Sequence, residues 1–121
     1  MKFKSIVIKG RGVGTELGFP TINLELNNIF SDINQGVYIC KVTVDNQVYK
    51  GVMHFGPRKS FDEVKPSLEI FLIGFTGEIY GETVEVEVFD KIRDIQRFSS
   101  RDDLKEQIRK DIEFTEQSKV I

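Results

Sequence analysis

The spacing of apolar residues changes once along this 121-residue chain, and the change limits the folds that the chain can adopt. Up to about residue 93, apolar residues occur in short runs, several of which alternate with polar residues as in half-buried β-strands. After residue 99 they recur every four residues, as on one face of a helix. Six segments are predicted to be strands: Phe3–Ile8, Thr21–Leu26, Gly36–Val44, Gln47–Phe55, Ser67–Phe75 and Glu82–Phe89.

The C-terminal segment is predicted to be a single helix. Ser99 and Ser100 are suitable N-caps, and Asp102–Asp103 would lie in the first turn, where negative charge opposes the helix dipole. Six strands followed by one helix predict a mainly β fold, namely a small antiparallel barrel with the helix against it. The apolar residues of the helix form a narrow stripe that can pack on the barrel: Leu104, Ile108 and Ile112.

Two connections between the predicted strands carry signals of their own. Asp45-Asn46 is a two-residue hairpin signal between the third and fourth strands. The segment Gly56–Lys65 contains a proline and three basic residues without a regular period, so a loop is predicted there. Arg93 and Phe98 are expected in the connector between the last strand and the helix.

The composition is that of an ordinary globular protein, and one domain over residues 1–121 is expected, with 40% hydrophobic and 30% charged residues. The net charge of −2 argues against a non-specific nucleic-acid binder, which would carry a basic surface. The single cysteine, Cys40, excludes a disulfide framework. No apolar run approaches the roughly 20 residues that span a bilayer. We therefore expect a cytoplasmic monomer without membrane or nucleic-acid partners.

A glycine-rich run precedes a short strand that carries two oxygen donors. Gly10, Gly12 and Gly14 lack side chains, so their backbone N–H groups can approach a phosphate closely. Thr21 and Asn23 follow on one face of the strand, and a hydroxyl and an amide oxygen are ligands that Mg²⁺ accepts. The run matches neither the P-loop nor the dinucleotide fingerprint, and a merely flexible loop remains the alternative.

Glu69 is the one charged residue in an otherwise apolar strand. Burying a carboxylate is costly unless it is paired or used, so a partly buried Glu69 would suit a general base. The alternative is a Glu69 that faces solvent on an edge strand. His54, the only histidine, and Cys40 are interpreted as structural strand residues, and neither is assigned a chemical role.

These separate features occur in an order that resembles the riboflavin kinase family, either as a single-domain enzyme or as the C-terminal module of bifunctional riboflavin kinase/FAD synthetases. The resemblance extends almost from end to end of the chain, and its Gly-Phe-Pro-Thr-x-Asn core is rather specific. The matching pieces are Gly10, Gly18–Leu24, Gly36–Tyr38, Leu68–Ile70, Tyr80-Gly81, Ile92–Asp94, Phe98-Ser99 and, in the helix, Leu104, Gln107-Ile108 and Asp111.

The resemblance implies a six-stranded antiparallel Greek-key barrel with a C-terminal helix. It implies ATP-dependent phosphorylation of the ribityl 5′-hydroxyl of riboflavin, with FMN and ADP as products. Glu69 would be the catalytic base, and Thr21 and Asn23 would hold Mg²⁺ with the nucleotide. Arg93 and Phe98 would contact the flavin. The residues expected near the nucleotide are Gly10, Gly12, Gly14, Gly18, Pro20, Thr21 and Asn23.

The chain departs from the family pattern mainly on the flavin side. Phe71 stands where a histidine is usual, Gly74 where an aspartate is usual, and Ile22 where alanine is common. The stretch Gly56–Phe61 differs from the usual Gly-x-Arg-Pro-Thr-Phe. Two other functions are therefore kept open: a non-catalytic flavin- or nucleotide-binding module, and a small barrel that mediates protein contacts.

Overall fold

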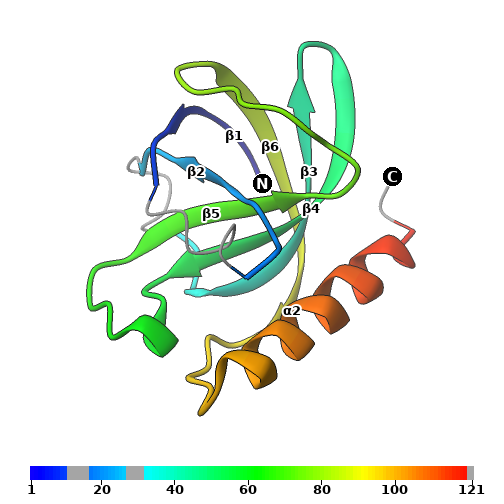
Figure 1. Cartoon of the computed structure of the whole chain (residues 1–121). Coiled ribbons are helices and arrows are strands. Elements are labelled where there is room, and N and C mark those ends of the chain that lie inside the picture. Colours follow the sequence, from blue (N-terminus) through cyan, green and yellow to red (C-terminus); the bar gives the residue numbers. More distant parts are fainter. Residues whose placement is uncertain (11–16, 27–31, 120–121) are drawn as a thin grey trace.

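Six strands close into an antiparallel barrel, as the sequence predicts. The structure is a computed structural model, and it describes residues 1–10, 17–26 and 32–119. Around the barrel the strands follow the order β1-β2-β5-β4-β3-β6, with every neighbouring pair antiparallel (Figure 1). The strands are β1 (Lys2–Ile8), β2 (Ile22–Leu24), β3 (Gly36–Val44), β4 (Gln47–Gly56), β5 (Ser67–Leu72) and β6 (Thr83–Arg93).

The strand order contains a Greek key. Strands β3, β4 and β5 follow one another as neighbours, and β6 returns to lie beside β3. The β3–β4 hairpin turns at Asp45-Asn46, whose φ angles of 48° and 68° are both positive, as a two-residue type I′ turn requires. The hairpin prediction is therefore confirmed.

The strand predicted as Thr21–Leu26 is shorter in the structure, where β2 spans only Ile22–Leu24. Three other differences from the sequence predictions are instructive. Strand β5 ends at Leu72 rather than Phe75, because the chain turns at Gly74, which has a φ of 82°. Strand β6 continues to Arg93, so this residue is the end of a strand and not part of the connector. The predicted loop Gly56–Lys65 contains a short 3-10 helix, η2 (Lys59–Phe61).

Alternate residues of the strands fill the barrel. In β5, Leu68, Ile70 and Leu72 are buried, and the residues between them point to the outer surface. Cys40 is fully buried in the same core, where burial raises the pKa of its thiol, in agreement with a structural role. The valines of β6 are buried as well, as the alternation of apolar and polar residues along this strand would place them: Val84, Val86 and Val88.

The helix α2 (Arg101–Glu116) lies against the outside of the barrel and packs on β4 (Figure 1). Ser100 is its N-cap, and the Ser100 side chain accepts a hydrogen bond from the Asp103 backbone N–H at 3.1 Å. No basic residue lies in the last turn, but Lys50 of β4 donates to the carbonyls of Glu116 and Ser118 at 3.0 and 2.7 Å. A strand thus supplies the cation that favours the negative end of the helix dipole.

The inward face of α2 differs from the predicted apolar stripe. Its two buried residues are polar, Asp111 and Thr115, whereas the stripe residues are only half-buried. Leu104 and Ile108 are partly exposed because they face a cavity between the helix and the barrel. No helix within residues 1–10, 17–26 and 32–119 is both long and apolar enough to cross a membrane.

Candidate active site

Three polar side chains lie in one row across the outer surface of the barrel. Asn23 of β2 is the register partner of Glu69 of β5, and Glu69 is the partner of His54 of β4. Directly opposite residues of antiparallel strands project to the same face, with Cβ atoms about 4.5–5.5 Å apart. Closure of the barrel therefore assembles a polar row from three strands that the sequence separates.

Glu69 is held at one of its two carboxylate oxygens. Its Oε2 accepts hydrogen bonds from Thr21 Oγ1 at 3.2 Å and from Arg58 Nη1 at 3.3 Å, and its side chain is only 13% exposed. Oε1 accepts no hydrogen bond from the described residues. Burial raises the pKa of Glu69, although the Arg58 charge and the Thr21 hydrogen bond oppose the shift. A partly buried carboxylate with a free oxygen can accept a proton, and the edge-strand interpretation is wrong.

Arg58 is a site residue that the sequence analysis missed. It is nearly buried, and its guanidinium also binds Glu63 through Nε at 2.9 Å and Nη2 at 2.7 Å. This two-point contact holds the guanidinium in a plane from which Nη1 reaches Glu69. The sequence did offer a signal, because Arg58 occupies the arginine position of the family's Gly-x-Arg-Pro-Thr-Phe stretch. Only the folded loop shows that this arginine faces Glu69.

Glycines next to the row meet two different structural needs. A Cβ at Gly10 would lie 2.0 Å from Nδ2 and 2.3 Å from Cγ of Asn23, so the absence of a side chain makes room for that amide. Gly18 instead has a φ of 87° with open space around it, so the turn before Pro20 is what requires glycine. Gly12 and Gly14 lie outside the described residues.

Gly10→Ala is expected to lower the free energy of unfolding by about 1–3 kcal/mol, because the added methyl group displaces the Asn23 side chain. Urea denaturation of the purified variant measures the loss. In an Asn23→Ala background the same Gly10→Ala change should cost almost nothing, because the colliding atoms are gone. An equal loss in both backgrounds would show that Gly10 serves another purpose.

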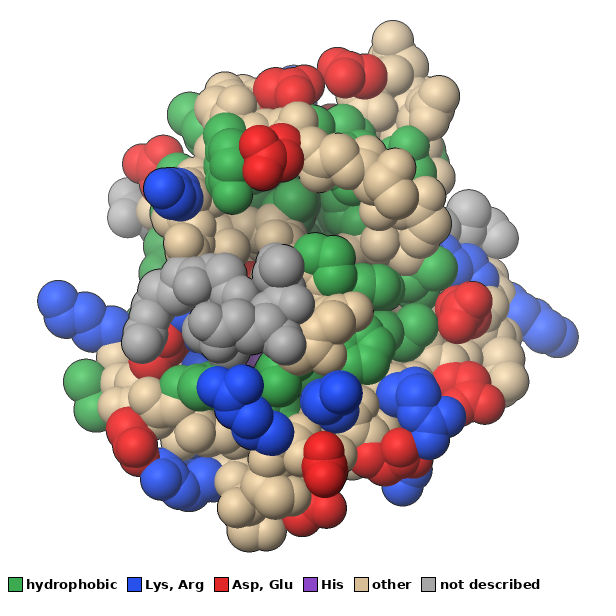
Figure 2. All heavy atoms as spheres, viewed as in Figure 1, with side chains coloured by type: hydrophobic (Ala, Val, Ile, Leu, Met, Phe, Trp, Pro, Cys, Tyr) green, Lys and Arg blue, Asp and Glu red, His purple; other side chains and the backbone are tan. Residues whose placement is uncertain are grey.

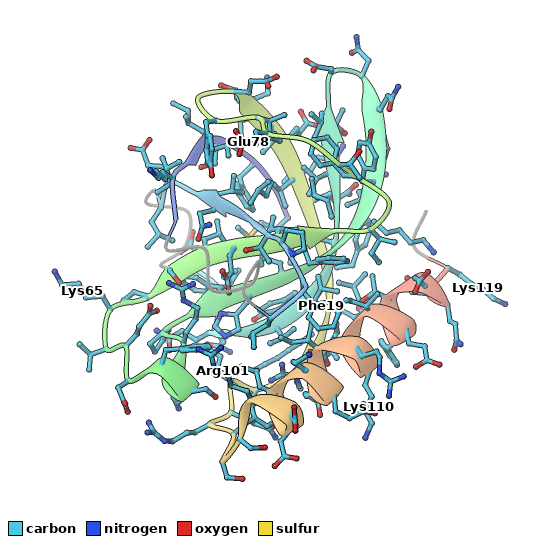
Figure 3. All side chains as sticks on the ribbon, in the orientation of Figure 1. Phe19, Lys65, Glu78, Arg101, Lys110 and Lys119 are labelled. Atoms are coloured by element: carbon cyan, nitrogen blue, oxygen red, sulfur yellow. The ribbon has the colours of Figure 1, made fainter. Side chains whose placement is uncertain are left out.

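Glu69 lines a cavity of about 90 Å³, and residues of the barrel surface, α2, η2 and the connector before the helix form its other walls. Phe19 lies between the barrel and α2 (Figure 3), where it packs edge-on against Phe71 at a centroid distance of 6.1 Å. Hydrophobic side chains gather in the band between barrel and helix, and charged side chains follow the outer side of the helix (Figure 2). The apolar lining consists of Leu17, Phe19, Val37, Val52, Phe61, Phe71, Phe98, Leu104 and Ile108.

Both residues predicted to contact a flavin line this cavity. The Arg93 guanidinium binds the Asp111 carboxylate, with Nη2 2.8 Å and Nε 3.1 Å from Oδ2, and lies 5.7 Å from the Phe98 ring centroid. Gln107 Nε2 donates to Asp111 Oδ1 at 2.9 Å, which completes the pairing of a carboxylate that is 2% exposed. Phe71, which stands where the family usually has a histidine, contributes an aromatic wall to the same cavity.

Two loops close the cavity by contacting each other. The backbone N–H of Phe98 donates to Ser60 Oγ at 3.0 Å. Arg97 Nη1 donates to the Lys59 carbonyl at 2.8 Å and pairs with Asp62 at 2.6 Å. The connector before α2 and the η2 loop therefore form one continuous wall of this cavity.

A second cavity, of about 420 Å³, lies on the other side of Thr21. Pro20, Thr21 and Ile22 contribute to its lining, together with Val7, Leu72 and residues 75–80. Thr21 lines both cavities, so its hydroxyl marks the point where groups bound in the two cavities would meet. Pro20 and Thr21, which were predicted to lie near a nucleotide, are both at this second cavity.

The donor set next to Glu69 suits Mg²⁺ more than a transition metal. The described residues contain no group of three or more His, Cys, Asp or Glu side chains that could hold a metal. They offer the Thr21 hydroxyl and the Asn23 amide, for which Gly10 leaves space. Mg²⁺ prefers oxygen ligands and usually keeps several waters and substrate phosphates, so two protein oxygens fit its chemistry.

Comparison with known proteins gives a consistent result. A family model described as riboflavin kinase matches residues 1–119. The chain is 40% identical over 111 residues to the bifunctional riboflavin kinase/FMN adenylyltransferase of Bacillus subtilis strain 168, covering 89% of this chain and 35% of that protein. It is 40% identical over 107 residues to the RNA-binding riboflavin kinase RibR of the same organism, covering 88% and 46%.

A solved structure shows the same fold at lower sequence identity. The riboflavin kinase from Trypanosoma brucei superposes with a TM-score of 0.68 at 22% identity, covering 95% of this chain and 76% of that one. The chain spans less than half the length of the two curated relatives above.

Proposed function

The chain belongs to the riboflavin kinase family, and from that premise we propose that it transfers the γ-phosphoryl group of ATP to the ribityl 5′-hydroxyl of riboflavin, giving FMN. The observation that carries the proposal is the position of Glu69. Its carboxylate lines an aromatic cavity and is hydrogen-bonded to Thr21, which also lines the second cavity. An acceptor substrate and a nucleotide in the two cavities would therefore meet beside a base.

The two cavities differ in the ligand that they suit. The first has aromatic and aliphatic walls with a few polar groups, a lining whose chemistry suits the faces of a flat ring system such as isoalloxazine. The second includes Pro20 and Thr21 in its lining, and we assign the nucleotide to it. Mg²⁺ would be held by Thr21 and Asn23 with the phosphates, and when bound it neutralises charge on the transferring phosphoryl group.

The residues of the chain supply alignment and a proton acceptor. Arg58 and Thr21 hold Oε2 of Glu69, so that Oε1 is left to accept the proton of the attacking hydroxyl. Phosphoryl transfer needs little covalent help from the protein, and positioning accounts for most of the catalysis. The wall formed by the η2 loop and the connector would shield one side of the acceptor from water, which would limit hydrolysis of ATP.

A direct assay tests this proposal. The protein is incubated with riboflavin and MgATP, and FMN and ADP are separated and quantified by chromatography; we expect both products in equal amounts. A parallel reaction without riboflavin should give little ADP. Binding of riboflavin without FMN under any nucleotide or divalent metal would instead favour the non-catalytic binding module, and absence of both would favour a barrel for protein contacts.

A further inference from the structure

His54 has an incomplete set of hydrogen bonds. Within residues 1–10, 17–26 and 32–119, its Nδ1 is the one buried side-chain nitrogen or oxygen without a hydrogen-bond partner. Buried polar groups in native proteins are almost always paired, because water that could bind them has been excluded. The exception therefore needs an explanation, and the sequence analysis assigned His54 no role.

The imidazole lies where a bound substrate would supply the missing partner. His54 is the register neighbour of Glu69 and lines the same cavity. A half-turn of the ring about the Cβ–Cγ bond exchanges Nδ1 with Cδ2, so the ring can turn its unpaired nitrogen without moving the backbone. A ligand atom next to the one that contacts Glu69 is therefore within reach of His54.

Burial and the charges around His54 keep the ring neutral. Burial, followed by the guanidinium groups of Arg93 and Arg58, lowers the pKa of His54 to about 4, and a backbone hydrogen bond within the residue and the Glu63 carboxylate oppose this only in part. A neutral imidazole has one nitrogen that donates and one that accepts a hydrogen bond. The neighbouring guanidinium groups have donors only, so His54 brings an acceptor to this side of the cavity.

We propose that His54 binds the polyol chain of the acceptor substrate by accepting a hydrogen bond from a hydroxyl next to the one that Glu69 deprotonates. The inference rests on the proposed function, because that function brings a polyol to Glu69. His54 is then a positioning residue: it holds the chain so that the terminal hydroxyl points at the base. A chain with several hydroxyls satisfies a neutral imidazole, whereas an apolar substituent leaves it unpaired.

The test measures binding without turnover, by equilibrium dialysis of riboflavin and of lumiflavin, which has the same ring system with a methyl group in place of the polyol. His54→Leu should bind riboflavin about tenfold more weakly, which corresponds to about 1.4 kcal/mol. His54→Asn should retain most of the affinity, because its amide can accept a hydrogen bond near the position of Nδ1. Lumiflavin should bind all three proteins equally.

The melting temperature of the unliganded protein separates this role from a structural one. His54→Leu removes an unpaired buried polar atom, so its melting temperature should equal or exceed that of the wild type. His54→Ala provides the same comparison if the leucine variant does not fold. Unchanged riboflavin affinity, or an equal loss for lumiflavin, would overturn the inference. If riboflavin binds the wild type more tightly than His54→Leu, but the wild type forms no FMN, only the proposed function would be rejected.

Discussion

Glu69→Gln is expected to lower kcat for FMN formation by about 10²–10⁴-fold, the usual contribution of a general base. The amide keeps the size of the side chain and can still accept hydrogen bonds from Thr21 and Arg58, but it cannot take up the proton of the hydroxyl. Riboflavin affinity should therefore change far less than kcat. Steady-state kinetics and equilibrium dialysis on the same preparation measure the two quantities.

Glu63→Gln is the matched control for this prediction. Glu63 is the other carboxylate that binds Arg58, yet it does not line the cavity. The same chemical change at this position should lower stability and reduce turnover much less than the change at Glu69. Wild-type turnover in Glu69→Gln, or equal losses in the two variants, would remove Glu69 as the base.

Asp111→Ala is expected to lower the free energy of unfolding by about 3–5 kcal/mol, because it leaves the Arg93 guanidinium without its carboxylate in a largely buried setting. Gln107 also loses its partner. The loss is measured by urea denaturation. It should be accompanied by weaker riboflavin binding, since Arg93 and Asp111 both line the cavity that we assign to the flavin.

Two further variants test whether the loss of stability comes from the buried Arg93–Asp111 pair or from another cause. Asp102→Ala removes an exposed carboxylate from the first turn of the same helix, and should cost no more than about 1 kcal/mol. Replacing Arg93 and Asp111 together with apolar residues should recover part of the stability, because no unpaired charge remains. If Asp111→Ala is as mild as Asp102→Ala, the pair does not hold α2 on the barrel.

The elements of the fold could be predicted because their signals are local. Alternation along β6 shows which residues enter the core, Asp45-Asn46 marks a turn, and Ser100 marks the start of α2. Each signal depends on a few neighbouring residues, as strand patterns, hairpin turns and caps do. The end of β5 was misplaced because the turn at Gly74 interrupts an apolar run that would otherwise continue as a strand.

The site was predicted only in part, because its contacts are long-range. Thr21, Asn23 and Glu69 were proposed from residue type and family pattern, and the structure brings them together. Arg58 was missed because a basic residue in a loop is usually solvated. Asp111 carried no sign of burial either, since a carboxylate on a helix enters the interior only when a partner such as Arg93 meets it there.

By itself, the sequence determined six strands and a capped helix, and it indicated candidate residues for a metal–nucleotide site and a proton acceptor. The tertiary structure decided which of these residues meet. Strand register places His54 next to Glu69, and packing of α2 supplies one wall of the cavity that both residues line. The physical reason is that register and barrel closure depend on pairing between distant strands, whereas period, turns and caps depend only on residues close in the chain.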